Sequence, residues 1–362
     1  MQRGILFLID RVTIGGTEGQ LRALVQGLSA GRFQPHLGTL SISDPDAGFP
    51  DLPGLSLSYR SFHHPSIFFC IWQLSNYVRR HRIRIVQTFF QDPTFLGALS
   101  KPFHPALLVG SFRDLGFWRN RRESFKMRLA YPAFAGFIAN SKAVKEHFVN
   151  VDGVAADKIE IIHNGITGDV IPISDTPRTS QSHLLVGIVA NLNRRVKRVD
   201  DFIRVAALVR DHCPAVRFVI VGDGELRQEL ESLSQSLGLA GLVQFAGRLR
   251  QPIDLVRTFA VGVNTSETEG FSNAVLEYMT CGIPVVATAN NGNAEMISDG
   301  INGFLVPVGD VKLMAKRVVT LLQEGEMRQA MRSANVQLVR SCFSLEQMVR
   351  NHERYYDRLL GS

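Results

Sequence analysis

Two glutamates with a fixed spacing are the first residues in the sequence that could act together on a ligand. Glu269 and Glu277 stand eight positions apart in SETEGFSNAVLEYM (266–279), and Ser272 is a suitable N-cap for a helix over NAVLEYM. A helix N-terminus offers amide groups and partial positive charge, which suit a diphosphate. The two carboxylates could then accept hydrogen bonds from a ribose and from a second polyol. In the alternative interpretation, both acids merely favour the helix N-terminus through its dipole.

A basic turn is the second candidate. The segment ANLNRRVKRVDDF (190–202) follows an apolar run and carries Arg194, Arg195 and Lys197. An arginine and a lysine at such a turn can neutralise a leaving nucleoside diphosphate. The alternative is a solvated basic turn without a ligand.

The elements that must position these residues alternate between apolar strand-like runs and helical segments. In the first half the strand candidates are ILFLI (5–9), PHLGTLSI (35–42), RIRIVQTFF (82–90), ALLVGSF (106–112), GFIANS (136–141) and IEIIHNG (159–165). In the second half they are LLVGIVANL (184–192), RFVIVGDGE (217–225), LVQFAGR (242–248), VGVNTSE (261–267) and PVVATA (284–289). This order predicts parallel sheets with helices on both faces.

The length of 362 residues exceeds what one core usually serves, which favours two domains. We expect a first Rossmann-like domain over residues 1–172 and a linker at 173–183, within a stretch rich in Pro, Ser and Thr. A second Rossmann-like domain covers 184–342, and the amphipathic segment 343–362 returns to the first domain. Ligands bind such sheets at the carboxyl ends of the strands, so the site is expected there, in a cleft between the domains.

Composition excludes several classes of protein. Hydrophobic content of 45% and charged content of 20% are those of an ordinary globular chain. Four scattered cysteines without a CxxC pair argue against a zinc site or a disulfide framework and favour a reducing cytoplasm. The aromatic run SIFFCIW (66–72) is too short to span a bilayer, so we expect no integral membrane protein.

The net charge of +7 is concentrated in the first domain, where residues 1–172 carry 19 Lys and Arg against 13 Asp and Glu. An excess of this kind favours anionic partners, although it also serves as a solubilising surface. The segment 111–134 combines arginines with aromatic residues, and RRHRIR (79–84) adds to it. This pattern suits an anionic membrane surface or a lipid-phosphate acceptor. The alternative for RRHRIR is a helix C-terminus stabilised by basic residues. The basic residues form no recognisable nucleic-acid motif, so no nucleic-acid partner is expected.

Several motifs together resemble one family. EGFSNAVLE (269–277) matches the E-x7-E motif of retaining glycosyltransferases with the GT-B fold, family 4. CGIPVVAT (281–288) and NGNAEMISDGINGFLVP (291–307) resemble neighbouring segments of the same family, and the resemblance covers most of residues 184–320.

The resemblance implies a role for each matching residue. Glu269 would contact the donor sugar and Glu277 the nucleotide ribose. Lys197 and Arg194, which fits better than its neighbour Arg195, would stabilise the departing diphosphate. The remaining donor-binding residues it implies are Gly15, Gly16, Gly247, Gly270, Phe271 and Ser272.

The first half departs from the family pattern at two places. Many members carry an aspartate where Thr167 stands, and many carry a histidine near the reacting centre, in the region of QTFFQDP (87–93) and SFRDLGFW (111–118). The polar candidates on the acceptor side of this region are Asp92, Arg113 and Asp114.

The sequence therefore predicts a retaining glycosyltransferase of the kind found in exopolysaccharide and lipid-linked glycan synthesis. It would move a sugar from a UDP- or GDP-sugar to a glycan or lipid-linked acceptor, in the cytoplasm at the inner face of the membrane. It would need no cofactor and no metal ion, because basic side chains and helix amides supply the positive charge. The alternatives are a nucleotide-sugar epimerase of the same fold and a non-catalytic binding protein.

Overall fold

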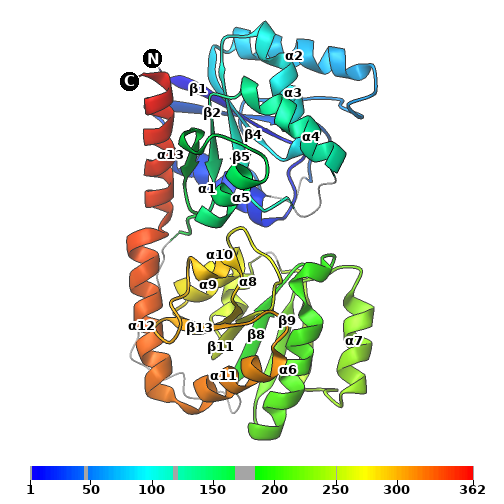
Figure 1. The fold of residues 1–362 in the computed structure, drawn as a ribbon, viewed down its shortest axis with the longest axis vertical. Coiled ribbons are helices and arrows are strands. Elements are labelled where there is room, and N and C mark those ends of the chain that lie inside the picture. Colours follow the sequence, from blue (N-terminus) through cyan, green and yellow to red (C-terminus); the bar gives the residue numbers. More distant parts are fainter. Residues whose placement is uncertain (1, 45–47, 117–120, 168–183, 250, 362) are drawn as a thin grey trace. The chain divides into compact units, whose positions relative to one another are not determined.

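A computed structural model describes residues 2–44, 48–116, 121–167, 184–249 and 251–361, and the chain divides into two compact units (Figure 1). Unit 1 comprises residues 1–165 and 345–362, and unit 2 comprises residues 166–344. The division thus falls after residue 165 rather than after residue 172. The predicted linker, 173–183, lies outside the described residues.

Unit 1 is built on a seven-stranded parallel sheet with strand order β3-β2-β1-β4-β5-β6-β7. Its strands are β1 (Arg3–Ile9), β2 (Phe33–Thr39), β3 (Gly54–Ser56), β4 (Ile83–Phe89), β5 (Leu107–Phe112), β6 (Gly136–Ala139) and β7 (Ile159–Ile161). Its helices are α1 (Gly16–Gly27), α2 (Ser66–Arg80), α3 (Gln91–Ser100), α4 (Arg121–Ala130), α5 (Lys142–Asn150) and α13 (Leu345–Leu360), with short 3-10 turns η2 (Lys101–Phe103), η3 (Tyr131–Ala133) and η4 (Ala156–Lys158). The prediction missed only β3 among these strands, because three residues at a sheet edge show no apolar pattern.

Alternation along β1 shows how the sheet is buried on both faces. Leu6 and Leu8 join the core that contains residues of α2, α3 and α4. Ile5, Phe7 and Ile9 join the core that contains residues of α1 and α13. Successive side chains of a strand point to opposite faces, so a continuous apolar run is what two helix layers require.

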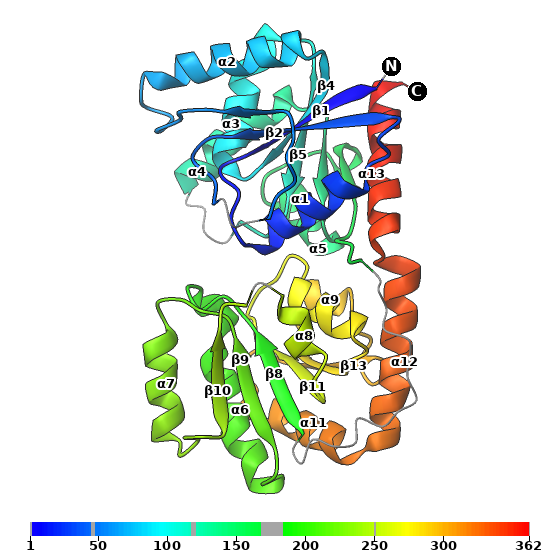
Figure 2. The ribbon, with the colours of Figure 1, turned by 180° about the vertical axis from the view of Figure 1, so that it is seen from behind.

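Helix α13 packs beside α1 on unit 1, although the whole of unit 2, residues 166–344, separates it in the sequence from the other parts of that unit (Figure 2). Glu353 Oε1 accepts a hydrogen bond from the Ser29 amide at 2.8 Å, and Tyr355 Oη donates to the Phe137 carbonyl at 3.3 Å. A Cβ on Gly27 would lie 2.6 Å from Val349 Cγ2, so the two helices meet where one has no side chain. The chain therefore closes unit 1 with its last helix.

Unit 2 is built on a six-stranded parallel sheet with strand order β10-β9-β8-β11-β12-β13. Its strands are β8 (Leu185–Val189), β9 (Arg217–Val221), β10 (Val243–Gly247), β11 (Val261–Asn264), β12 (Val285–Thr288) and β13 (Gly303–Val306). Its helices are α6 (Val199–His212), α7 (Arg227–Ser236), α8 (Pro252–Val256), α9 (Asn273–Thr280), α10 (Asn291–Ala294), α11 (Val311–Gln323) and α12 (Gly325–Cys342), and η5 (Arg195–Lys197) is a 3-10 turn.

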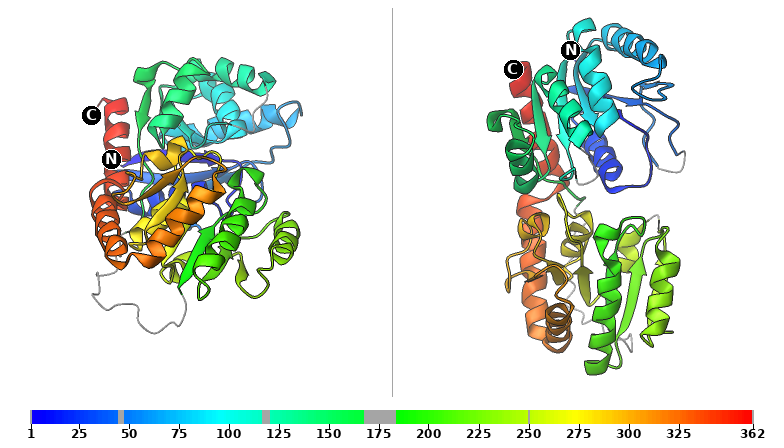
Figure 3. Two further views of the ribbon diagram at one scale, coloured as in Figure 1. Left: turned by 60° about the horizontal axis from the view of Figure 1, so that its bottom comes forward. Right: turned by 45° about the vertical axis from the view of Figure 1, so that its right-hand side comes forward.

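The unit 2 sheet is also covered on both faces (Figure 3). Phe218 and Ile220 face one apolar core, and Val219 and Val221 face the other. The two parallel α/β sheets confirm the predicted fold class. Among the described residues, no helix is both long enough and apolar enough to cross a bilayer.

Candidate functional site

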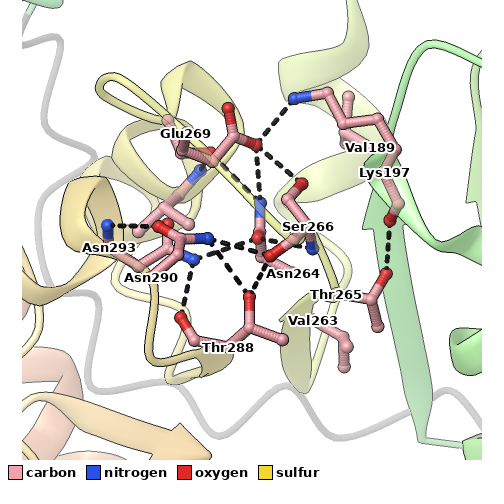
Figure 4. Close-up of polar contacts among 12 residues, drawn as sticks. Val189, Lys197, Val263, Asn264, Thr265, Ser266, Glu269, Thr288, Asn290 and Asn293 are labelled. Carbon is pink, nitrogen blue, oxygen red and sulfur yellow. Dashed lines mark hydrogen bonds and ion pairs between the residues drawn. The ribbon is translucent and has the colours of Figure 1, made fainter. Parts of the chain in front are cut away.

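Glu269 and Lys197, predicted to act on the same ligand, form an ion pair in unit 2. Lys197 Nζ lies 2.6 Å from Glu269 Oε1, which also accepts a hydrogen bond from Ser266 Oγ at 2.7 Å (Figure 4). Their side chains keep 21% and 11% exposure, so both remain open to a ligand. Thr265 Oγ1 donates to the Lys197 carbonyl at 2.8 Å, which ties the turn after β8 to the end of β11. The pair therefore stands at the carboxyl ends of two adjacent strands.

Beneath this pair lies a buried network of amide side chains. Asn293 Nδ2 donates to Asn264 Oδ1 at 3.1 Å and to the Thr288 carbonyl at 3.0 Å. Asn290 Nδ2 donates to the Ser266 carbonyl at 2.9 Å, and its Oδ1 accepts from the Asn293 amide at 3.0 Å. Asn264 reaches upward, with Nδ2 lying 3.5 Å from Glu269 Oε1 (Figure 4). The network connects the ends of β11 and β12 with the start of α10, and so fixes the base on which Glu269 stands.

These amides were missed in the sequence. The available signal was positional: NTS (264–266) and TANN (288–291) place polar residues directly at the ends of apolar strands. Gly292 completes the support, because a Cβ there would lie 2.6 Å from the Glu269 carbonyl oxygen and 2.8 Å from that of Gly270. The loop that carries Glu269 therefore rests directly on a glycine backbone.

The start of α9 lies beside Glu269, as predicted. Ser272 is the N-cap, with its hydroxyl accepting from the Val275 amide at 3.4 Å and lying 3.2 Å from Asn264 Nδ2. Phe271 is buried, and its ring packs edge-on against Phe343 at 5.4 Å. Gly270 is buried as well. The backbone at this helix N-terminus is thus held from below and can present its positive end to an anion.

Glu277 lies one turn into α9 and lacks a partner for part of its carboxyl group. Its Oε2 atom is buried without a hydrogen bond among the described residues. Burial raises the pKa of Glu277 to about 7. A buried acceptor of this kind is satisfied when a ligand hydroxyl donates to it.

The arginines of the basic turn differ in their contacts. Arg195 is exposed and pairs with Glu229 at 3.1 and 2.8 Å. Arg198 adopts a left-handed conformation, φ 48°, and pairs with Asp201 at 2.7 Å. Arg194 is exposed on the same turn and, with Arg195, lines a pocket of about 100 Å³.

Gly247 lies where three strands end close together. It adopts φ 71°, and its carbonyl accepts from the Gly222 amide at 2.9 Å. A Cβ on Gly222 would lie 1.8 Å from the Ala190 carbonyl oxygen. Only glycine permits this approach, so main chain rather than side chain is exposed to a ligand at the ends of β8, β9 and β10.

In unit 1, Gly15 and Gly16 begin α1 and are exposed, with Gly15 as its N-cap. Asp92 lies in the first turn of α3. Burial and the charge of Asp92 raise the pKa of Asp10, the first residue after β1, to about 7, and burial also raises the pKa of Asp92. Asp10 was missed, although a lone acid at a strand end is a readable signal.

Arg113 and Asp114 follow β5 and line one pocket of unit 1. Arg113 Nη2 donates to Asn164 Oδ1 at 2.7 Å, and Asp114 Oδ1 accepts from the Gly116 amide at 2.8 Å. Thr167 is exposed, and part of the segment 111–134, at 117–120, lies outside the described residues. Within the described ranges, no group of three or more His, Cys, Asp or Glu side chains could hold a metal ion.

Two family models together match most of the chain. The model described as "Glycosyltransferase Family 4" matches residues 14–169, and the one described as "Glycosyl transferases group 1" matches residues 183–324.

Curated relatives match over part of their length. EpsD of Bacillus subtilis is 35% identical over 137 residues, which cover 38% of this chain and 35% of EpsD. The lipopolysaccharide core biosynthesis glycosyltransferase LpsE of Rhizobium meliloti is 29% identical over 224 residues, covering 58% of this chain and 63% of LpsE. The chain thus spans between a third and two thirds of these relatives.

A solved structure shares the fold over its full length. HepE of Anabaena in complex with UDP superposes with a TM-score of 0.83, at 22% identity, over 99% of this chain and 100% of that one. At this identity the similarity shows the fold, which is the one the sequence predicted.

Proposed function

Because the chain belongs to the family 4 glycosyltransferases, with the GT-B fold, we propose that it transfers a sugar from a nucleotide-diphosphate donor to a glycan or lipid-linked acceptor, with retention of configuration. The observation that carries this proposal is the Lys197–Glu269 ion pair beside the N-terminus of α9. A cation, a carboxylate and a helix N-terminus meet at the carboxyl end of one sheet, and a sugar diphosphate needs all three.

In this proposal Lys197 moves from Glu269 to the diphosphate when the donor binds. The positive charge then neutralises the leaving group, and the amides at the start of α9 add to it. Arg194 lies exposed on the same turn, and the family resemblance favours it over Arg195 as the second cation. No metal ion is required for this neutralisation.

The two glutamates divide the neutral parts of the donor. Glu269 accepts hydrogen bonds from hydroxyls of the sugar, since among the described residues no protein group donates to its Oε2 atom, while Oε1 accepts from Lys197 and Ser266. Glu277 accepts a ribose hydroxyl on its unpartnered Oε2. The acceptor hydroxyl attacks the anomeric carbon on the face from which the diphosphate departs, so that its proton passes to the leaving phosphate.

A UDP-sugar is the donor that we propose first, because HepE, of the same fold, binds UDP. The test is thermal stabilisation by UDP, GDP and ADP, followed by NMR of the slow hydrolysis of UDP-glucose. We expect UDP to raise the unfolding midpoint and α-glucose to be the first product, since retention preserves the donor anomer. β-Glucose would contradict retention, a C4 or C2 epimer without UDP release would indicate the epimerase, and no response to any nucleotide would indicate a non-catalytic protein.

We also propose that unit 1 contacts an anionic membrane through α2, η2 and α4. Among the described residues, the exposed aromatic side chains all lie there. They are Phe68, Phe69, Trp72, Phe103 and Phe125. Contacts of α2 with α3 and of α3 with α4 place these helices side by side (Figure 1). Arg79 and Arg80 are exposed at the end of α2, so aromatic and basic groups share one surface, as interfacial helices require.

Co-sedimentation with vesicles tests this contact. We expect binding to phosphatidylglycerol-containing vesicles but not to pure phosphatidylcholine, weakened by salt. The double variant Phe68→Ser, Trp72→Ser should lose binding, whereas Ile42→Ser, at a side chain 91% exposed elsewhere on unit 1, should retain it. Equal binding by both variants would contradict the proposal.

A further inference from the structure

A pocket at the carboxyl end of the unit 1 sheet lies apart from the residues assigned to the donor. It is bordered by the ends of β4 and β5, by the start of α3 and by α4. Its volume open to water-sized groups is about 40 Å³, room for a few waters or for one small oxyanion. Much of its wall is apolar, from Phe90, Phe112, Met127 and Phe148.

One cation lines this pocket without an acid to balance it. Arg113 donates from Nη2 to the neutral Asn164 at 2.7 Å, and its Nε atom is buried with no partner. Arg113 forms no ion pair in the part of the chain that the structure describes. Burial lowers the pKa of Arg113 to about 10, so it stays charged at neutral pH. Buried charges are normally paired, because leaving water is costly without a counter-charge.

The neighbours of Arg113 do not supply that counter-charge. Asp114 also lines the pocket, but its Oδ1 accepts from the Gly116 amide at 2.8 Å, and it forms no ion pair with Arg113. On α13, burial and the charge of Arg113 lower the pKa of His352 to about 4, so that residue is neutral. Among the described residues, the guanidinium group of Arg113 therefore has no anionic partner, and a bound anion would supply one.

Two features of the wall favour a ligand at this place. Phe90 adopts φ 67° and ψ −177°, a conformation almost confined to glycine, and such strain gathers at ligand sites. Thr94 Oγ1 donates to the Phe90 carbonyl at 2.6 Å and holds it there. Helix α3 begins at the next residue, Gln91, so the positive end of a ten-residue helix borders the same pocket.

We propose that this pocket binds an oxyanion carried by the acceptor, with Arg113 as its principal donor. The inference rests on the proposed transfer and deepens it: the acceptor is an acidic molecule, a phosphate ester or a carboxylate, rather than a neutral sugar. The planar fork of arginine suits either group, because it can donate two parallel hydrogen bonds. The apolar wall then contacts the part of the acceptor next to the anion.

Calorimetric titration with inorganic phosphate and with acetate, at constant ionic strength, tests the pocket. Phosphate represents a phosphate ester and acetate represents a carboxylate. The anion that binds with the higher affinity identifies the acidic group of the acceptor. We expect Arg113→Met to weaken the preferred anion by about 10- to 100-fold, the range for hydrogen bonds to charged groups. The affinity of Arg113→Lys for the anion should lie between those of the parent and of Arg113→Met, since lysine keeps the positive charge but lacks the planar guanidinium group. The matched control is Arg84→Met, at an exposed arginine near the other end of β4.

The same variants distinguish a ligand site from a structural role. We expect the thermal midpoint of Arg113→Met to equal or exceed that of the parent, because an unpaired and partly buried charge has been removed. A large drop in midpoint, or anion affinity unchanged in Arg113→Met, or binding of neither anion by the parent, would overturn the proposal. Hydrolysis of UDP-glucose is measured separately. Hydrolysis without anion binding would contradict the pocket and leave the proposed transferase standing. Anion binding without hydrolysis would contradict the transferase, and with it the acceptor role of the pocket, and leave only an anion site.

Discussion

At the carboxyl end of the unit 2 sheet, Glu269 rests on a network of three amide side chains. Asn293 donates to Asn264, Asn264 donates to Glu269, and Asn290 donates to the Ser266 carbonyl. At the same end of the unit 1 sheet, Arg113 keeps a buried donor without a partner, and Phe90 holds a strained backbone. The carboxyl end of the unit 2 sheet is organised before a ligand arrives. In the proposal above, the carboxyl end of the unit 1 sheet is completed by a bound anion. In the proposed function, Glu269 must keep its position during the reaction, whereas the proposed anion pocket has to admit and release a molecule in every cycle.

The sharpest test of the unit 2 edge is Glu269→Ala. We expect transfer or donor hydrolysis to fall by about 10²–10³-fold, the usual loss when one electrostatic group at a reacting centre is removed. Phosphate affinity of unit 1 should not change, since no part of that pocket is touched. The control Glu267→Ala removes an exposed acid two positions earlier. Full activity in Glu269→Ala would contradict the role proposed for Glu269.

The network itself is tested by Asn293→Ala. The change removes the hydrogen bonds to Asn264 Oδ1 and to the Thr288 carbonyl and leaves a cavity at a fully buried side chain, so the free energy of unfolding should fall by about 2–4 kcal/mol. Urea unfolding measures this, with Asn291→Ala, at an exposed neighbour, as control. If Asn293→Ala and Asn291→Ala have the same free energy of unfolding, the network below Glu269 is not preorganised, and the contrast with unit 1 is wrong.

The smallest expected effect is a pH dependence from Glu277. Its pKa is raised from 4.5 to about 7, so the folded state holds the proton more tightly than the unfolded chain. Stability then falls as the pH rises from about 4.5 to 7 and is level above that range. Relative to the parent, Glu277→Gln should gain up to about 3 kcal/mol between pH 5 and pH 8 in urea unfolding. A difference that stays constant with pH would show that the carboxyl group is not buried in this way.

Much of this organisation was readable in the sequence. The strands of both sheets were predicted except β3 and β13, and Ser272 was identified as the cap that starts α9. The GFLV segment of β13 was assigned to a motif rather than to a strand, because four residues that begin with a glycine show no clear period. The spacing of Glu269 and Glu277 predicted one acid before the helix and one inside it, and the structure has them there.

Other features depend on residues that are distant in the chain. Lys197 and Glu269 are 72 positions apart and meet only because β8 and β11 are neighbours in the sheet. The choice between Arg194 and Arg195 needs Glu229, which binds Arg195 from α7. Arg113 could be identified as a candidate, but its lack of a counter-charge could not, since that depends on everything packed around it.

The sequence alone determined the local decisions: where apolar runs become strands, where Ser272 starts a helix, and how far apart two glutamates lie along it. These follow from periodicity and capping, which act over a few residues. Tertiary structure alone decided which charges are satisfied. Lys197 pairs with Glu269, and Arg113 pairs with no acid among the residues that the structure describes, because pairing and burial depend on side chains brought together from separate strands and helices.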